Sequence, residues 1–285
     1  MSDAPRERHL RARSLAFRAI EWPGDAPAAL LLHATSFCAD AWRPVWEAAR
    51  AAAPRPRRAV AVDQRGHGGS DAPATAAAYA WTELALDVAA LADALGAPLL
   101  GVGHSSGATA LLAAAGMRPA GFAAVVAVEP VLFASGSSFA GGGALAASAR
   151  RRRDRFASRE EARARLRGRF PYSGFAAEAF EAVLDGALES TPEGVALRCP
   201  GEREAWCYEG AAALDLWPLA ARIAAPLLLV LGEQSAVPPE LRDRLLDGRA
   251  HAEVATIPAA THFAALEQPA QVGRAIARFA SERLG

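Results

Sequence analysis

The sequence contains neither lysine nor asparagine among its 285 residues, and only 7% of the residues are aromatic. It also carries no formal net charge, because 31 arginines are balanced by 31 aspartates and glutamates. Proteins that collect nucleic acid or an anionic membrane surface through their overall field have a large positive charge. The balance therefore argues against both kinds of partner and favours a small molecule.

Cysteine is scarce, and so are long apolar runs. Cys38, Cys199 and Cys207 are odd in number and lack the paired spacing of a zinc site or a disulfide framework, so we expect no metal and a reducing compartment. No apolar run approaches the ~20 residues that span a bilayer. The first 14 residues are charged and have no apolar core of a signal peptide. These absences predict a cytoplasmic protein.

What the chain does have is enough apolar material, 52% of its residues, for one large core. Continuous apolar runs, typical of strands buried on both faces of a parallel sheet, recur along it. We expect such strands at residues 28–34, 59–63, 98–104, 123–129 and 226–232, with helices at 40–52 and 81–96 between them. The alternation predicts an α/β fold.

The two ends of the chain extend the same sheet, while a long stretch near the middle interrupts it. Residues 10–22 predict an edge hairpin, and residues 251–257 a last strand before a helix at 268–283. Residues 134–215 break the alternation with helical, arginine-rich sequence. We therefore expect a core in two parts, residues 1–133 and 216–285, with residues 134–215 forming a helical lid.

The strongest chemical signal is Gly103-His104-Ser105-Ser106-Gly107, which lies between a predicted strand and an alanine-rich helix. G-x-S-x-G in this context is a nucleophile elbow, a turn so tight that side chains at the glycines would clash. The turn presents the hydroxyl of Ser105 above the sheet. The following helix aims its first amides at the same point, so the Ser106 N–H can stabilise an oxyanion.

A serine nucleophile needs a histidine base, and we expect it late in the chain. His262 lies beyond the last predicted strand, in a loop that could reach Ser105. His104 should point away from the serine. His33 and His67 are predicted to shape early loops through hydrogen bonds, and His9 and His251 to lie on the surface.

The elbow, together with HATSFCADAW at 33–42, DQRGHGGSD at 63–71 and THF at 261–263, resembles the α/β-hydrolase superfamily over residues 10–133 and 216–283. The resemblance implies a mostly parallel central sheet with helices on both faces. It also implies that the Thr35 N–H is the second oxyanion donor. The stretch at 63–71 matches a segment that holds neighbouring loops in place, so we assign it a structural role.

The acid of the triad departs from the family's usual pattern. In most relatives an aspartate follows the strand that corresponds to residues 226–232, but Ser235 occupies that position here. Glu129, at the end of the strand after the nucleophile, occupies an alternative acid position of the superfamily. It would lie at the carboxyl edge of the sheet, where ligands of such folds bind. Glu233 is the alternative acid, and a third hypothesis is that no functional acid exists.

The arginine-dense stretch at 150–170 suggests either a site for an anionic substrate or nucleic acid, or a solvated helix face. The interleaved acids, including Glu160 and Glu161, favour the solvated face. Lid aromatics predict an apolar pocket with few polar anchors. They are Phe133, Phe139, Phe170, Tyr172, Phe175, Phe180, Trp206 and Tyr208.

The function expected from these residues is hydrolysis of a carboxylic ester or related acyl bond of a small apolar substrate, without metal or cofactor. Carbon-carbon bond hydrolysis, lactone opening and perhydrolysis use the same serine constellation and remain alternatives. A protein that binds a small ligand without hydrolysing it is a further alternative, and Ser235 in place of aspartate is its main support. The oligomeric state stays open.

Overall fold

A computed structural model describes residues 4–134 and 141–285. Its centre is an eight-stranded sheet in the order β1-β2-β4-β3-β5-β6-β10-β11. Strands β1 and β2 form an antiparallel hairpin, β2 also runs antiparallel to β4, and the other neighbours are parallel. This is the predicted α/β fold with a mostly parallel sheet and an edge hairpin.

The strands lie within three residues of the predicted runs, except that the first begins four residues before the predicted hairpin. Their bounds are β1 Arg6–Ala12, β2 Leu15–Trp22, β3 Asp25–Leu32, β4 Arg57–Val62, β5 Leu99–His104, β6 Phe122–Val128, β10 Leu227–Gly232 and β11 Ala252–Ile257. Every residue of β5 and β10 is buried, as expected of strands covered on both faces.

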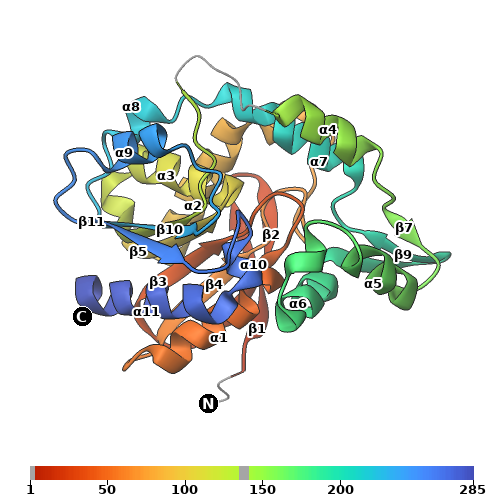
Figure 1. The fold of residues 1–285 in the computed structure, drawn as a ribbon, viewed down its shortest axis with the longest axis horizontal. Helices are drawn as coiled ribbons and strands as arrows, with labels where there is room; N and C mark the ends of the chain where they lie inside the picture. Colours follow the sequence, from red (N-terminus) through yellow and green to blue (C-terminus); the bar gives the residue numbers. More distant parts are fainter. Residues whose placement is uncertain (1–3, 135–140) are drawn as a thin grey trace.

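Helices cover both faces of the sheet (Figure 1). Helices α1 (Arg43–Ala52) and α11 (Pro269–Leu284) pack against each other on one face, over a core that includes Trp46 and Phe279. The other face is covered by α2 (Trp81–Leu95), α3 (Ser106–Met117), α8 (Trp217–Ala220) and α9 (Pro239–Leu246). Helix α2 ends as its sequence predicts, with Gly96 in the left-handed conformation at φ 84°.

We refer to residues 141–215, which lie within the segment between β6 and β10, as the insertion. It lies beside the sheet and contains α4 (Gly142–Arg150), α5 (Arg159–Arg167), α6 (Ala177–Ala187) and α7 (Gly201–Glu209) (Figure 1). The insertion contains helices, as expected, but also strands that the sequence did not predict. A small antiparallel sheet there consists of β7 (Arg155–Phe156), β9 (Gly194–Leu197) and β8 (Leu188–Thr191). Strands this short show no clear alternation of apolar and polar residues, so the sequence pattern does not predict them.

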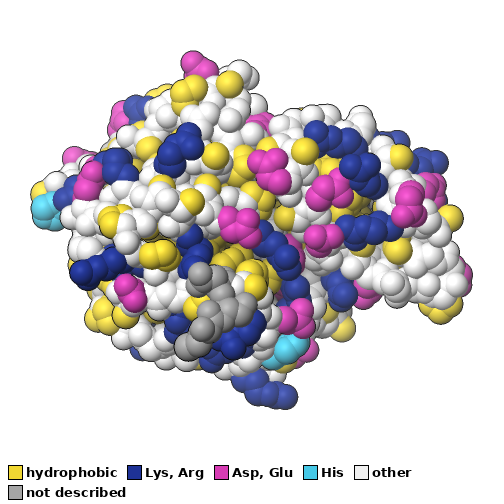
Figure 2. All heavy atoms as spheres, turned by 90° about the horizontal axis from the view of Figure 1, so that it is seen from below, with side chains coloured by type: hydrophobic (Ala, Val, Ile, Leu, Met, Phe, Trp, Pro, Cys, Tyr) yellow, Lys and Arg dark blue, Asp and Glu magenta, His cyan; other side chains and the backbone are white. Residues whose placement is uncertain are grey.

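The remaining short elements are the 3-10 turns η1 (Ala39–Trp42), η2 (Ala76–Tyr79), η3 (Pro119–Gly121), η4 (Tyr172–Gly174) and η5 (Gly210–Ala213), and helix α10 (Ala264–Glu267). Basic and acidic side chains are interspersed on the face shown in Figure 2. No helix in the described part of the chain combines the length and the apolar character needed to cross a membrane.

Candidate active site

Ser105 lies at the turn between β5 and α3, with φ 55° and ψ −121°. A non-glycine residue in this conformation is strained, and its neighbours must hold it there. The Ser105 N–H donates to Val128 O at 2.9 Å. A Cβ atom at Gly103 would lie 2.6 Å from the backbone of Ala108, and one at Gly107 would collide with the carbonyl of His33. The glycines are therefore required for the tight turn.

His262 follows β11, in the loop before α10, and its Nε2 lies 2.9 Å from Ser105 Oγ. The sequence thus predicted a pair that the fold brings together across 157 positions of the chain. His262 is partly exposed, whereas Ser105 is only 8% exposed. An imidazole at this distance can take the hydroxyl proton as Ser105 attacks.

His104 fixes the backbone beneath this imidazole, a role that sequence reasoning missed. Its Nε2 lies 2.8 Å from the carbonyl oxygen of His262. Burial lowers the pKa of His104 to about 3, so its ring is neutral at pH 7 and donates the Nε2 proton to that carbonyl. In the sequence, the position of His104 next to Ser105 was the only indication of such a role. Its partner, the carbonyl of His262, lies too far along the chain to be predicted from the sequence.

Glu129 follows β6 and lies beside His262, with its Oε2 3.5 Å from His262 Nδ1. Its side chain is completely buried, and its backbone has φ 46°. Both Glu129 and Ser105 are therefore held in a strained backbone conformation. Its Oε1 accepts the N–H of Gly232 at 2.7 Å, and its Oε2 accepts the hydroxyl of Ser235 at 2.9 Å. Both hydrogen bonds satisfy the oxygens of this buried side chain.

Glu233, the alternative acid, lies elsewhere. It is exposed, and its Oε2 accepts the N–H of Ala259 at 3.0 Å. Among residues 4–134 and 141–285, the carboxylate paired with His262 is that of Glu129. The geometry therefore places Glu129 at the imidazole and Glu233 in the role of a loop-capping side chain.

The two predicted oxyanion donors, Thr35 and Ser106, also lie together. The Thr35 N–H donates to Ser106 Oγ at 3.0 Å, and the Thr35 hydroxyl donates to the same oxygen at 2.9 Å. Ser106 is the first residue of α3, so its N–H is not used within the helix. The N–H of Thr35 thus faces the first turn of α3, beside Ser105, and Ser106 Oγ is its acceptor in this structure.

Two histidines shape the loop that carries Thr35, as predicted. His33 accepts the N–H of Gln64 at 3.0 Å, and His67 accepts the N–H of Ser36 at 3.1 Å. Burial lowers their pKa values, to about 4 for His33 and about 3 for His67, so both rings remain neutral acceptors. The segment at 63–71 therefore holds the loop beside the elbow in place.

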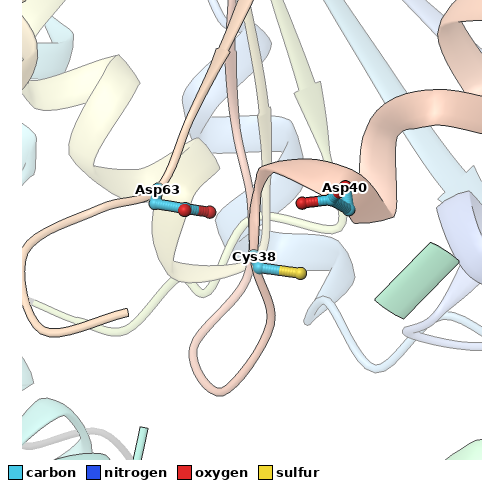
Figure 3. A group of neighbouring side chains, drawn as sticks. All are labelled: Cys38, Asp40 and Asp63. Atoms are coloured by element: carbon cyan, nitrogen blue, oxygen red, sulfur yellow. The ribbon is translucent and has the colours of Figure 1, made fainter. Parts of the chain in front are cut away.

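Cys38, Asp40 and Asp63 lie at the base of the same loop, with possible ligand atoms within 4.8 Å of one another, and the carboxylates of Asp40 and Asp63 face each other (Figure 3). The guanidinium of Arg18 lies 2.9 Å from Asp40 and 3.0 Å from Asp63, so the two acids already share a cation. Burial and the nearby Asp40 raise the pKa of the Cys38 thiol, which disfavours the thiolate a metal needs. The cluster fits a structural ion pair better than a metal centre.

A cavity of about 460 Å³ opens between the insertion and the loop of Thr35. Thr35 and Phe263, the neighbour of His262, belong to its lining, so the cavity lies beside the candidate catalytic residues. Its lining differs from the apolar one expected, because five arginines face it together with aromatic side chains. Phe139 lies outside the described residues.

A second cavity, of about 480 Å³, is lined by Trp217, Leu227 and Arg249. Leu227 begins β10, so this cavity lies at the amino end of that strand. Ligands of open α/β sheets bind at the carboxyl ends, where Ser105 and Glu129 lie. The first cavity is therefore the candidate substrate pocket.

The profile of the alpha/beta hydrolase family matches residues 29–275, which is most of the chain. No curated protein matches the sequence.

Solved structures of hydrolases share the fold over almost the full length. E-2-(acetamidomethylene)succinate hydrolase is 26% identical, with a TM-score of 0.83 over 98% of this chain and 100% of that one. The thioesterase domain from the curacin biosynthetic pathway is 21% identical, with a TM-score of 0.77 over 96% and 99%. A thermophilic esterase from Thermogutta terrifontis is 21% identical, with a TM-score of 0.72 over 98% and 100%.

Proposed function

Because the chain belongs to the alpha/beta hydrolase family, we propose that it is a serine hydrolase that cleaves an acyl bond through an acyl-enzyme. Ser105 is the nucleophile, His262 the base, and Glu129 the acid that orients the imidazole. The observation that carries the proposal is the 2.9 Å contact of His262 Nε2 with Ser105 Oγ, backed by a buried carboxylate on the other ring nitrogen. This is the nucleophile, base and orienting group of a catalytic triad.

The reaction proceeds in two halves. Ser105 Oγ attacks the acyl carbon while its proton passes to His262 Nε2, and the backbone N–H groups of Thr35 and Ser106 bind the oxyanion. The bond to the leaving group breaks as Nε2 returns the proton to it. Water then attacks the acyl-enzyme, losing a proton to His262, and the acid product leaves as Ser105 regains that proton.

Glu129 stabilises the imidazolium that forms in both halves. Its distance of 3.5 Å from His262 Nδ1 is long for a hydrogen bond, as is common before substrate binds. Gly232 and Ser235 both donate hydrogen bonds to the carboxylate and fix its position. Ser235 thus supports an acid that comes from the neighbouring strand, and its presence in place of aspartate no longer favours a protein that only binds its ligand.

The bond cleaved is an ester or a related acyl bond. Carbon-carbon bond hydrolysis, lactone opening and perhydrolysis use the same residues, and the similar structure at 26% identity is a hydrolase of a substituted succinate. No metal or organic cofactor takes part in the steps above. We also propose that residues 134–215 act as the lid of the site, because the cavity beside Thr35 is lined largely by side chains of the insertion.

A fluorophosphonate probe tests the proposal directly, since it reacts with activated serines and forms an adduct visible by intact mass. Wild type should be labelled once, and Ser105→Ala should not be labelled. Ser281→Ala, on the outer helix α11, is the matched control and should be labelled like wild type. Labelling that persists in Ser105→Ala, or wild type that does not react, contradicts the proposal.

A further inference from the structure

The cavity beside Thr35 is unusual in its charge. Arg151, Arg152, Arg153, Arg165 and Arg169 belong to its lining, against a single carboxylate, that of Glu204. A concave surface with charges of one sign concentrates counter-ions, because its low-dielectric walls focus the field. A protein without net charge therefore has a cluster of cations in the cavity that reaches Thr35 and Phe263.

Some of these arginines have acidic partners. Arg152 lies 2.7 Å from Glu204, and Arg153 and Arg165 lie 3.0 and 3.1 Å from Glu161. These contacts neutralise only part of the cluster.

Arg151 and Arg169 have no acidic partner among residues 4–134 and 141–285. Arg151 follows α4, and Arg169 follows α5, so the two approach the cavity from different elements. On helix α5, Arg163 is the solvated side chain that the sequence predicts, since it pairs with Glu181 at 2.6 Å and does not line the cavity. Arg163 is therefore a reference for the arginines that line the cavity.

Arg152 is held in a fixed orientation in the lining. One edge of its guanidinium is fixed, because NH2 donates to Cys199 O at 2.9 Å and pairs with Glu204. Guanidinium groups bind carboxylates through pairs of parallel N–H groups.

Much of the rest of the lining is apolar. Phe170 is 81% exposed and Leu145 41% exposed, and both border the cavity, as do Tyr172 and Phe263. Exposed apolar side chains around a cavity commonly mark a binding site. A ligand that satisfies this lining has a short apolar chain and an anionic end.

We propose that this cavity binds a carboxylate of the substrate, so that the compound hydrolysed at Ser105 is a small acid whose anionic end lies a few bonds from the scissile acyl group. The inference rests on the proposed function, because it takes Thr35 and Phe263 as the side of the cavity that faces the reacting atoms. It replaces the apolar substrate expected from the sequence. Arg151, Arg152 and Arg169 supply the charge and the hydrogen bonds.

The effect of the substrate's charge is tested with two activated esters that have the same acyl chain. One is 4-nitrophenyl hydrogen adipate, which carries a carboxylate, and the other is its neutral methyl ester. Wild type should hydrolyse the acid with kcat/KM about tenfold or more above that of the neutral ester, mainly through KM, because hydrogen bonds to a charged group are stronger than neutral ones. The preference should shrink at high salt, since Arg151 and Arg169 are exposed.

The variants Arg151→Gln and Arg169→Gln should lower kcat/KM for the acid by about five- to tenfold each and leave the neutral ester within twofold. Arg163→Gln removes an arginine of α5 that does not line the cavity and should change neither substrate. Equal rates for the acid and the neutral ester in wild type would overturn the inference, as would an equal effect of Arg169→Gln on both.

Binding without turnover separates this inference from the proposed function. Calorimetry on Ser105→Ala should detect adipate and show weaker binding when Arg169→Gln is added, whereas inorganic phosphate at equal concentration should bind more weakly. Absent adipate binding, or phosphate binding as tight as adipate, overturns the carboxylate site. The proposed hydrolase function still holds if adipate does not bind but the neutral ester is hydrolysed through Ser105. Conversely, if adipate binds but no ester is cleaved and no probe reacts, the carboxylate site is supported and the proposed hydrolase function is wrong.

Discussion

The hydroxyl of Ser235 donates a 2.9 Å hydrogen bond to Oε2 of Glu129, the oxygen that also lies nearest to His262 Nδ1. Ser235 follows β10, and Glu129 follows β6, the strand paired with it. Position 235, where the family resemblance leads us to expect the acid, therefore holds a hydrogen-bond donor. The carboxylate of Glu129 approaches the imidazole of His262 from the adjacent strand.

Glu129→Gln should lower kcat/KM on 4-nitrophenyl acetate by about 10⁴-fold, the scale of losing a triad carboxylate. The amide cannot stabilise the imidazolium and favours the wrong tautomer of His262. Ser235→Ala should cost about tenfold or less, since Gly232 still donates to the carboxylate. Glu233→Gln is the control and should resemble wild type. Near wild-type activity of Glu129→Gln would refute the assignment.

Ser235→Asp should place a second carboxylate beside the buried Glu129, and the pair should share a proton, because like charges this close together raise each other's pKa. A pKa raised in the folded state gives stability that is present at low pH and lost as pH rises through it. The variant should therefore be less stable relative to wild type at pH 8 than at pH 5 in urea unfolding. The double variant Glu129→Gln/Ser235→Asp carries one carboxylate and should recover about 100-fold of the activity lost in Glu129→Gln. No recovery would mean that only the position on β6 can hold the acid.

Ser106→Ala should leave kcat/KM within about threefold of wild type, because the proposed oxyanion donors are backbone N–H groups that the substitution retains. It should still lower the free energy of unfolding by about 1–3 kcal/mol, since the buried N–H of Thr35 loses its acceptor. Steady-state kinetics and urea unfolding measure the two effects. A loss of activity near 10²-fold would show instead that the Ser106 hydroxyl itself binds the oxyanion.

The stability of the protein should fall as pH decreases from 6.5 towards 4. Burial lowers the pKa of His33 to about 4 and those of His67 and His104 to about 3, whereas an unfolded histidine titrates near 6.5. Between these values the unfolded chain binds protons that the folded protein does not, so stability is complete above pH 6.5 and is lost below it. Each histidine contributes roughly 1.4 kcal/mol per pH unit in that window.

Urea unfolding at pH 7, 6 and 5 measures this slope. The double variant His9→Gln/His251→Gln is the matched control, because both histidines are exposed and their removal should leave the slope unchanged. A free energy of unfolding that stays constant from pH 7 to pH 5 would show that the three buried rings are not held neutral.

The sequence by itself determined the strands and helices of the core, the turn at Ser105 and the choice of His262. These features are local, because hydrophobic runs define strands and the tight turn at Ser105 leaves room only for glycine at positions 103 and 107. It also pointed to Glu129, since a charge at the end of an otherwise apolar strand needs a partner.

Only the tertiary structure decided which groups those residues meet. The pairing of β6 with β10 brings Ser235 to Glu129 across 106 positions, and the carbonyl of His262 reaches His104 across 158. The fold likewise separates Arg169, which faces the cavity, from Arg163, which faces solvent beside Glu181. Such contacts depend on strand order and on how the insertion packs, which no local pattern of residues encodes.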